Sequence, residues 1–173
     1  MRKQITTLLL FIAVILWGTW FGGQLFNEAL VIPKWLSSPP QSMLAYDAIP
    51  VKGGFFFFMI NPFFTLFSLL ATIFGWNVAG KSRTWMLLAT LIGFIVSLVL
   101  IFYLAPLIHV TNEYAIQGSI PANQIIANTK EWMVGNRIRL VLEFCGFLFS
   151  IIALQTWAKE SNYKIAAVNA NLK

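Results

Sequence analysis

The chain alternates between long apolar stretches and polar connections. Four stretches are long enough to cross a bilayer, and they cover about 5–26, 55–78, 85–110 and 133–158. Each has more than 20 residues, and roughly 20 residues at about 1.5 Å per residue cross a hydrocarbon core of about 30 Å. Lipid cannot satisfy backbone hydrogen bonds, so helices are the expected form. The pattern predicts an all-α integral membrane four-helix bundle with antiparallel neighbours.

The connections between these stretches differ in length. A tight connection at 79–84 joins the second and third stretches, whereas those at about 27–54 and 111–132 are long and are predicted to be outer loops. The first outer loop contains four prolines and is expected to be irregular, while 122–129 in the second could form a short helix. The first apolar stretch is too long for the core of a signal peptide. The whole chain, 1–173, is therefore predicted to be a single four-span membrane domain.

Composition and charge support a membrane location and set the orientation. Hydrophobic residues make up 58% and charged residues 10%, with a mean hydropathy of +0.75, which is too apolar for a small water-soluble protein.

Seven basic residues and Glu160 fall on the side that carries the termini, against five basic and four acidic residues on the other. Lys and Arg in short loops favour the cytoplasmic side, so both termini are predicted to be cytoplasmic. We expect a multi-pass protein of the cell membrane, in a bacterium the inner membrane. The seven basic residues are Arg2, Lys3, Lys81, Arg83, Lys159, Lys164 and Lys173, and the five are Lys34, Lys52, Lys130, Arg137 and Arg139.

Polar side chains inside the spans gather toward their outer ends. On the fourth span, Asn136, Arg139 and Glu143 lie within about 60° of one another on a helix that turns by about 100° per residue. Polar groups are costly in lipid, so we expect one polar pocket below the outer surface. The catalytic candidates are His109, Asn136, Arg139 and Glu143, and the ligand-binding candidates are Trp20, Gln24, Asn27 and Asn61.

These residues also have structural interpretations. Arg139 and Glu143 are four residues apart and can form an ion pair that only ties helices together. Asn61 precedes Pro62 and can satisfy a kink in its helix. His109 can lie at the interface and meet water. Arg137 points away from the polar face and is expected to extend toward lipid headgroups.

Three short segments resemble the anthrone oxygenase-like family of small four-helix membrane proteins, whose members are mostly uncharacterised. The segments are Phe21-Gly22-Gly23-Gln24-Leu25-Phe26-Asn27, Ile120-Pro121-x-Asn123 and Trp132-x-x-x-Asn136-Arg137-x-Arg139. Some fungal members are implicated in oxidising anthrones to anthraquinones without a metal or flavin. The resemblance implies a cofactor-independent oxygenase in which Asn136, Arg139 and His109 bind and deprotonate a phenol-like substrate.

Two functions follow as alternatives. The first is a membrane-embedded protein that binds or oxidises a small lipophilic, phenol-like or anthrone-like molecule in the polar pocket. The second is a structural or assembly subunit of a membrane complex without catalytic activity.

No metal or cofactor is expected, since the chain has one His and one Cys and His109 lacks an obvious second axial ligand. Membrane lipid and a small lipophilic ligand are the expected partners. Nucleic acid is not, because the basic residues form no stripe.

Overall fold

The computed structural model describes residues 1–48 and 54–170, with side-chain detail for all of these except 47, 54–59, 114, 116 and 163–170. The described chain is almost entirely helical and contains no strand, which confirms the all-α prediction. In chain order, with η marking a π-helical segment, the helices are α1 (Arg2–Phe26), η1 (Asn27–Val31), α2 (Ile32–Trp35), α3 (Gln41–Asp47), α4 (Gly54–Gly75), α5 (Ser82–Val99), η2 (Leu100–Leu104), α6 (Ala105–Gln117) and α7 (Ala122–Ala170).

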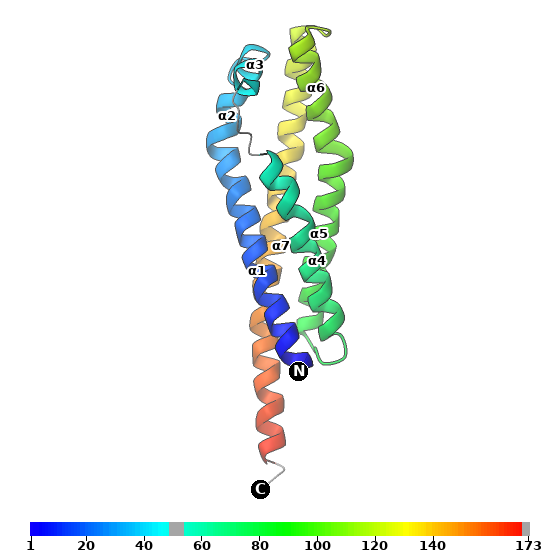
Figure 1. The fold of residues 1–173 in the computed structure, drawn as a ribbon. Helices are drawn as coiled ribbons and strands as arrows, with labels where there is room; N and C mark the ends of the chain where they lie inside the picture. The colour runs from blue at the N-terminus through cyan, green and yellow to red at the C-terminus, as the bar shows by residue number, and fades with distance from the viewer. Residues whose placement is uncertain (49–53, 171–173) are drawn as a thin grey trace.

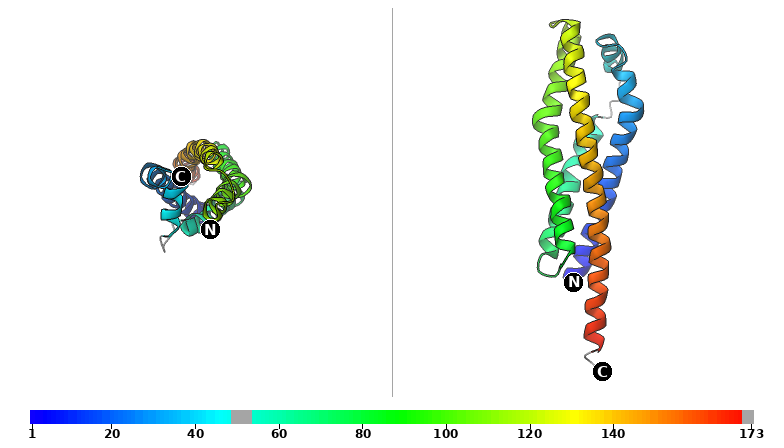
Figure 2. Two further views of the ribbon diagram at one scale, coloured as in Figure 1. Left: turned by 90° about the horizontal axis from the view of Figure 1, so that it is seen from above. Right: turned by 180° about the vertical axis from the view of Figure 1, so that it is seen from behind.

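The long helices pack in a closed ring. Within it, α1 contacts α4 and α7, and α5 contacts the same two helices, as the end-on view in Figure 2 shows. Neighbours run antiparallel. The start of α1 and the C-terminal part of α7 lie at one end of the ring, and α7 continues well past that end (Figure 1). We call the opposite end, where α3 and the α6–α7 connection lie, the distal end.

Length and apolar composition indicate a helical membrane protein. Three helical stretches are long and apolar enough to cross a membrane, namely Arg2–Trp35, Ser82–Glu113 and Ala122–Asn162. The helix α4 has 22 residues, and its part Ile60–Gly75 is a shorter apolar helix. Large apolar side chains such as those of Phe102 and Val141 are exposed, as expected where a helix faces lipid.

The distal end is more helical than the sequence predicts. The predicted outer loop 27–54 is helical as far as Trp35 and again in α3, while its part 49–53 lies outside the described residues. The predicted loop 111–132 shortens to 118–121, because α6 runs to Gln117 and α7 begins at Ala122. Gly118 ends α6 with a φ of 63°, a conformation that suits glycine. The spans therefore continue beyond their predicted ends.

A proline follows each of the two π-helical segments. The segment η1 precedes Pro33, and η2 precedes Pro106. Proline has no amide hydrogen, so the carbonyl four residues earlier loses its α-helical partner, and a wider turn accommodates the mismatch. Such a turn rotates the residues after it, so faces calculated for a regular helix no longer hold beyond Phe26. Glu28 lies in η1.

Aromatic rings and one glycine fix how α1 meets its neighbours. The rings of Trp17 and Trp20 are fully buried, with centroids 4.2 Å and 5.4 Å from that of Phe64 on α4. The Trp17 indole also donates a hydrogen bond to Ser68 Oγ at 3.1 Å. A Cβ atom on Gly146 of α7 would stand within 2.8 Å of three atoms of the Trp17 ring. Glycine therefore permits the close approach of α1 and α7.

Glu160 of α7 secures the turn between α4 and α5, at the end of the ring that carries the termini. Its carboxylate accepts hydrogen bonds from the backbone N–H groups of Gly80 (3.0 Å) and Ser82 (3.3 Å) and from the Ser82 hydroxyl (2.6 Å). Burial raises the pKa of Glu160, but these hydrogen bonds outweigh it and hold the pKa below its ordinary value.

Candidate functional site

Five polar side chains form a continuous path across the α1–α7 interface, toward the distal end. We call this path the polar chain, and its members in order are Arg137, Glu28, Asn136, Arg139 and Glu143. Glu28 accepts hydrogen bonds from Arg137 Nε at 2.8 Å and from Asn136 Nδ2 at 2.9 Å. Arg139 donates from Nη2 to Asn136 Oδ1 at 2.7 Å, and its Nε lies 3.2 Å from Glu143 Oε1. The path leads from an exposed guanidinium to a buried carboxylate.

The polar chain is exposed at its Arg137 end and buried at its Glu143 end. The side chain of Arg137 is 63% exposed, whereas Arg139 is 4% exposed and Glu143 is 0% exposed. Two guanidinium groups alternate with two carboxylates, so the charges balance. Moving either charge of the inner pair out of water alone would be costly, whereas the pair with its hydrogen bonds loses much less. The polar chain can therefore persist inside an apolar interface.

The pairing of α1 with α7 brings two more of the predicted site residues to this level. Three contacts define the register of the two antiparallel helices: Trp157 donates a hydrogen bond to the Thr7 hydroxyl, Trp17 packs on Gly146, and Asn136 donates a hydrogen bond to Glu28. Moving one residue forward along α1 therefore corresponds to moving about one residue back along α7. This register places Gln24 level with Arg139. It also places Trp20 level with Glu143, and the Trp20 indole interacts with that carboxylate. Both residues are buried, as the sequence predicts for an inward face.

Three buried oxygen atoms at this level accept no hydrogen bond of good geometry. They are Oε1 of Gln24 and both carboxylate oxygens of Glu143. The contact between Arg139 Nε and Glu143 Oε1 has the distance of an ion pair without the geometry of a hydrogen bond. Buried polar atoms normally have partners, because an unsatisfied group costs about 1–3 kcal/mol. All three atoms are acceptors, and the Arg139 guanidinium and the Trp20 indole lie beside the Glu143 carboxylate as donors. A hydroxyl group, which both donates and accepts hydrogen bonds, suits this mixed position.

Three other residues predicted for the pocket lie elsewhere or only at its margin. His109 is 72% exposed, and its Nδ1 lies 3.6 Å from Glu113 Oε2, so the imidazole is on the outside of the bundle. Asn61 is buried between α4 and α5, where its Oδ1 accepts a hydrogen bond from Ser97 at 3.3 Å. Asn27 is half-buried in η1. The expected convergence of all four spans on one site therefore reduces to α1 with η1 and α7.

Glu28 is a member of the polar chain that the sequence places at the depth of the pocket but does not single out as a site residue. A regular helix places it on the same face as Gln24, yet it could equally lie at the interface and meet water. The structure makes it the link between Arg137 and Asn136. Arg137 is mostly exposed, but the prediction that it points away from the polar face is wrong, because its guanidinium bonds Glu28. The signal in the sequence is Pro33, which marks the π-helical turn.

The polar chain offers hydrogen bonding and proton acceptance rather than metal binding. Among the residues that the structure describes, no group of three or more His, Cys, Asp and Glu side chains could hold a metal ion. Glu143 can accept a hydrogen bond or a proton from a hydroxyl group, and Arg139 beside it can stabilise the resulting negative charge.

Comparisons of the chain with known protein families, with curated proteins and with solved structures find no match.

Proposed function

We propose that this chain crosses the membrane four times, with α4 as the additional span and both termini in the cytoplasm. The helix α4 has 22 residues, which at about 1.5 Å per residue gives about 33 Å, enough for the hydrocarbon core. It packs beside α1 and α5, which belong to long apolar stretches. The basic residues concentrate on the side of the termini, which supports this orientation. A bacterial inner membrane fits it.

We propose further that the protein binds a small lipophilic molecule with a hydroxyl group, such as a phenol, between α1 and α7. The observation that carries the proposal is the set of three buried acceptor oxygens on Gln24 and Glu143. A phenolic O–H would supply the donor, and its ring would lie among the apolar and aromatic side chains of the interface. The buried indole of Trp20 is beside the same carboxylate.

The same geometry limits the chemistry that we propose. The resemblance to the anthrone oxygenase-like family implies a site of Asn136, Arg139 and His109, but His109 is on the exposed side of α6. Proton acceptance from a phenol would then fall to Glu143, with Arg139 stabilising the charge. We therefore propose binding with hydrogen-bond or proton acceptance, and no oxidation step is assigned to these residues.

In this structure the three acceptor atoms are closed off from solvent. A ligand must displace side chains to reach them, and the contacts of Glu28 with Arg137 and Asn136 lie directly on the distal side of the site. Slow association is the expected consequence, because the bonds that close the interface have to open first.

The test is the set of lipophilic molecules that copurify with the protein, identified by untargeted mass spectrometry. The parent should carry a hydroxyl-bearing molecule that the double variant Arg139→Met with Glu143→Leu lacks. The matched control is Ile138→Ala, a change at a 60% exposed position of the same helix, which should leave the profile unaltered. A folded double variant with the parent's profile would refute the proposal.

A structural role is the second candidate, and a specific observation favours it. Two hydrogen bonds that Glu28 accepts connect η1 to α7, and a third hydrogen bond and one ion pair join the remaining members within α7. Such a connection would suit a subunit whose shape matters more than its chemistry. In that case, the double variant would match the parent in every binding assay. The ligand profile therefore separates the two functions.

A further inference from the structure

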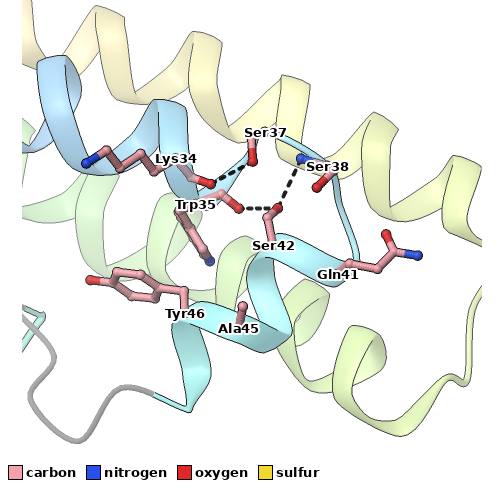
Figure 3. A pocket seen from close by; sticks show the side chains of 8 residues that line it. All are labelled: Lys34, Trp35, Ser37, Ser38, Gln41, Ser42, Ala45 and Tyr46. Carbon is pink, nitrogen blue, oxygen red and sulfur yellow. Dashed lines mark hydrogen bonds between the residues drawn. The ribbon is translucent and has the colours of Figure 1, made fainter.

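A second candidate site lies at the distal end, in the corner where α2 turns back into α3. Figure 3 shows this hollow, which has a volume of about 480 Å³. Its lining residues are Lys34, Trp35, Ser37, Ser38, Gln41, Ser42, Ala45 and Tyr46. None of them belongs to the polar chain, so the hollow is a separate feature.

Hydrogen bonds hold the corner in shape. Ser42 Oγ donates to the carbonyl of Trp35 at 2.7 Å and accepts from the backbone N–H of Ser38 at 3.1 Å. Behind the corner, Met43 is fully buried in a small core with Ala115 and Ile125, which attaches α3 to α6 and α7. The walls of the hollow are therefore built before any ligand arrives.

The polar groups that remain available in the hollow suit an anion. Lys34 is the only charged residue among those that line it, and none is acidic. Figure 3 shows the side chains of Lys34 and Tyr46 extending to the same side, with the Trp35 indole between them. Within the described residues, no hydrogen bond or ion pair engages the Lys34 ammonium or the Tyr46 hydroxyl. An ammonium and a phenolic hydroxyl together suit an oxyanion such as phosphate.

The surroundings of the hollow point to a lipid as the source of that anion. It lies at the end of the apolar stretch Arg2–Trp35, and on this stretch Phe26 and Leu30 are more than half exposed. Trp35 and Tyr46 are the residue types that gather where a membrane meets water. A phospholipid would place its phosphate in the hollow and its acyl chains along the exposed apolar side chains.

We infer that this hollow binds the phosphate group of a membrane phospholipid, held by Lys34 and Tyr46 over Trp35. The inference rests on the four-span placement proposed above and is independent of any ligand at the polar chain.

The experiment measures lipid binding to the full-length protein by native mass spectrometry after delipidation. The probes are dimyristoyl phosphatidylglycerol and dimyristoylglycerol, which share their acyl chains and differ in the phosphate headgroup. The variants are Lys34→Gln and Tyr46→Phe, and the control is Lys130→Gln, which neutralises an exposed basic residue of α7 outside the hollow. Thermal unfolding of each variant verifies that the fold is intact.

The expected result is that phosphatidylglycerol binds the parent and Lys130→Gln alike. Lys34→Gln should weaken binding roughly tenfold, as expected when a hydrogen bond to a charged group is lost. Tyr46→Phe should weaken it less, and dimyristoylglycerol should bind at least tenfold more weakly than phosphatidylglycerol.

Equal binding by Lys34→Gln and Lys130→Gln, or equal binding of the two lipids, would overturn the inference. Glycerol 1-phosphate provides the remaining arm. If this soluble phosphate binds as tightly as the lipid, the hollow recognises a free phosphate compound and the assignment to phospholipid is wrong. If Lys34→Gln does not fold, Tyr46→Phe decides alone, and unaltered binding by that variant overturns the role of the hollow.

Discussion

Removing the guanidinium of Arg139 should destabilise the protein strongly. Glu143 is 0% exposed, neither of its carboxylate oxygens accepts a hydrogen bond of good geometry, and Arg139 Nε at 3.2 Å is its counter-charge. Arg139→Ala would leave that carboxylate buried without a counter-charge, and Asn136 Oδ1 would lose its donor. Breaking a buried pair in this way costs about 3–5 kcal/mol. At roughly 2–4 °C per kcal/mol for a chain of this length, the melting temperature should fall by about 6–20 °C.

Restoring charge balance should recover most of that loss. Arg139→Met with Glu143→Leu removes both charges and fills the space with apolar side chains, a replacement that is often neutral or stabilising. Thermal unfolding in one detergent, for the parent, both single variants and the double variant, gives the coupling between the two residues. Ile138→Ala on the lipid-facing side of α7 serves as the control for truncation alone. The reasoning fails if Arg139→Ala melts with the control, or if the double variant is no more stable than Arg139→Ala.

Three further predictions test other parts of the structure. Reporters fused at Lys173 and near Ser42 should report opposite sides of the membrane, and a periplasmic signal from Lys173 would reverse the topology. Gly146→Ala should lower the free energy of unfolding by about 1–3 kcal/mol, because the added Cβ collides with the Trp17 indole of α1. The control Gly22→Ala should be tolerated, because its Cβ meets nothing within 4 Å, and equal melting temperatures of the two variants would contradict this packing. The folded-state pKa of Glu160 is lowered, so its stabilising contribution is present above the unfolded pKa of about 4.5 and disappears as the pH falls through the folded pKa. Glu160→Gln should therefore be less stable than the parent at pH 7 and should lose less stability than the parent when the pH is lowered. Equal pH profiles of stability for the two proteins would show that the hydrogen bonds of this carboxylate do not stabilise the fold.

The fold follows from simple features of the sequence. The apolar stretches give helices because lipid leaves the backbone no other partners, and the spacing of Asn136, Arg139 and Glu143 gives their shared face. The inward positions of Trp20 and Gln24 follow in the same way. These predictions depend only on regular helical geometry, which holds through most of α1 and α7.

The sequence is less informative where geometry departs from a regular helix. Pro33 belongs to the predicted first outer loop and Pro106 to the predicted third span, and near both prolines the helix passes through a π-helical turn and continues. The continuation turns two predicted loops into helices. It also gives Glu28 a role that its position on a regular helix leaves open. His109 and Asn61 lie at the depth of the polar chain but not at its interface. The position of a residue along a span predicts its depth, whereas it does not predict which neighbouring helix the side chain will face.

The most direct test of the account is whether the protein distinguishes a phenol from its methyl ether. Equilibrium dialysis of 1-naphthol and 1-methoxynaphthalene against the purified protein, corrected with empty detergent micelles, measures this preference. The two probes share an aromatic body, but only 1-naphthol can donate a hydrogen bond to the acceptors of Gln24 and Glu143. We predict that 1-naphthol binds the parent at least roughly tenfold more tightly, as expected for a hydrogen bond to a buried charged acceptor. The preference should disappear in the variant Arg139→Met with Glu143→Leu. Equal binding of both probes to the parent, or an undiminished preference in that variant, would contradict the proposed site.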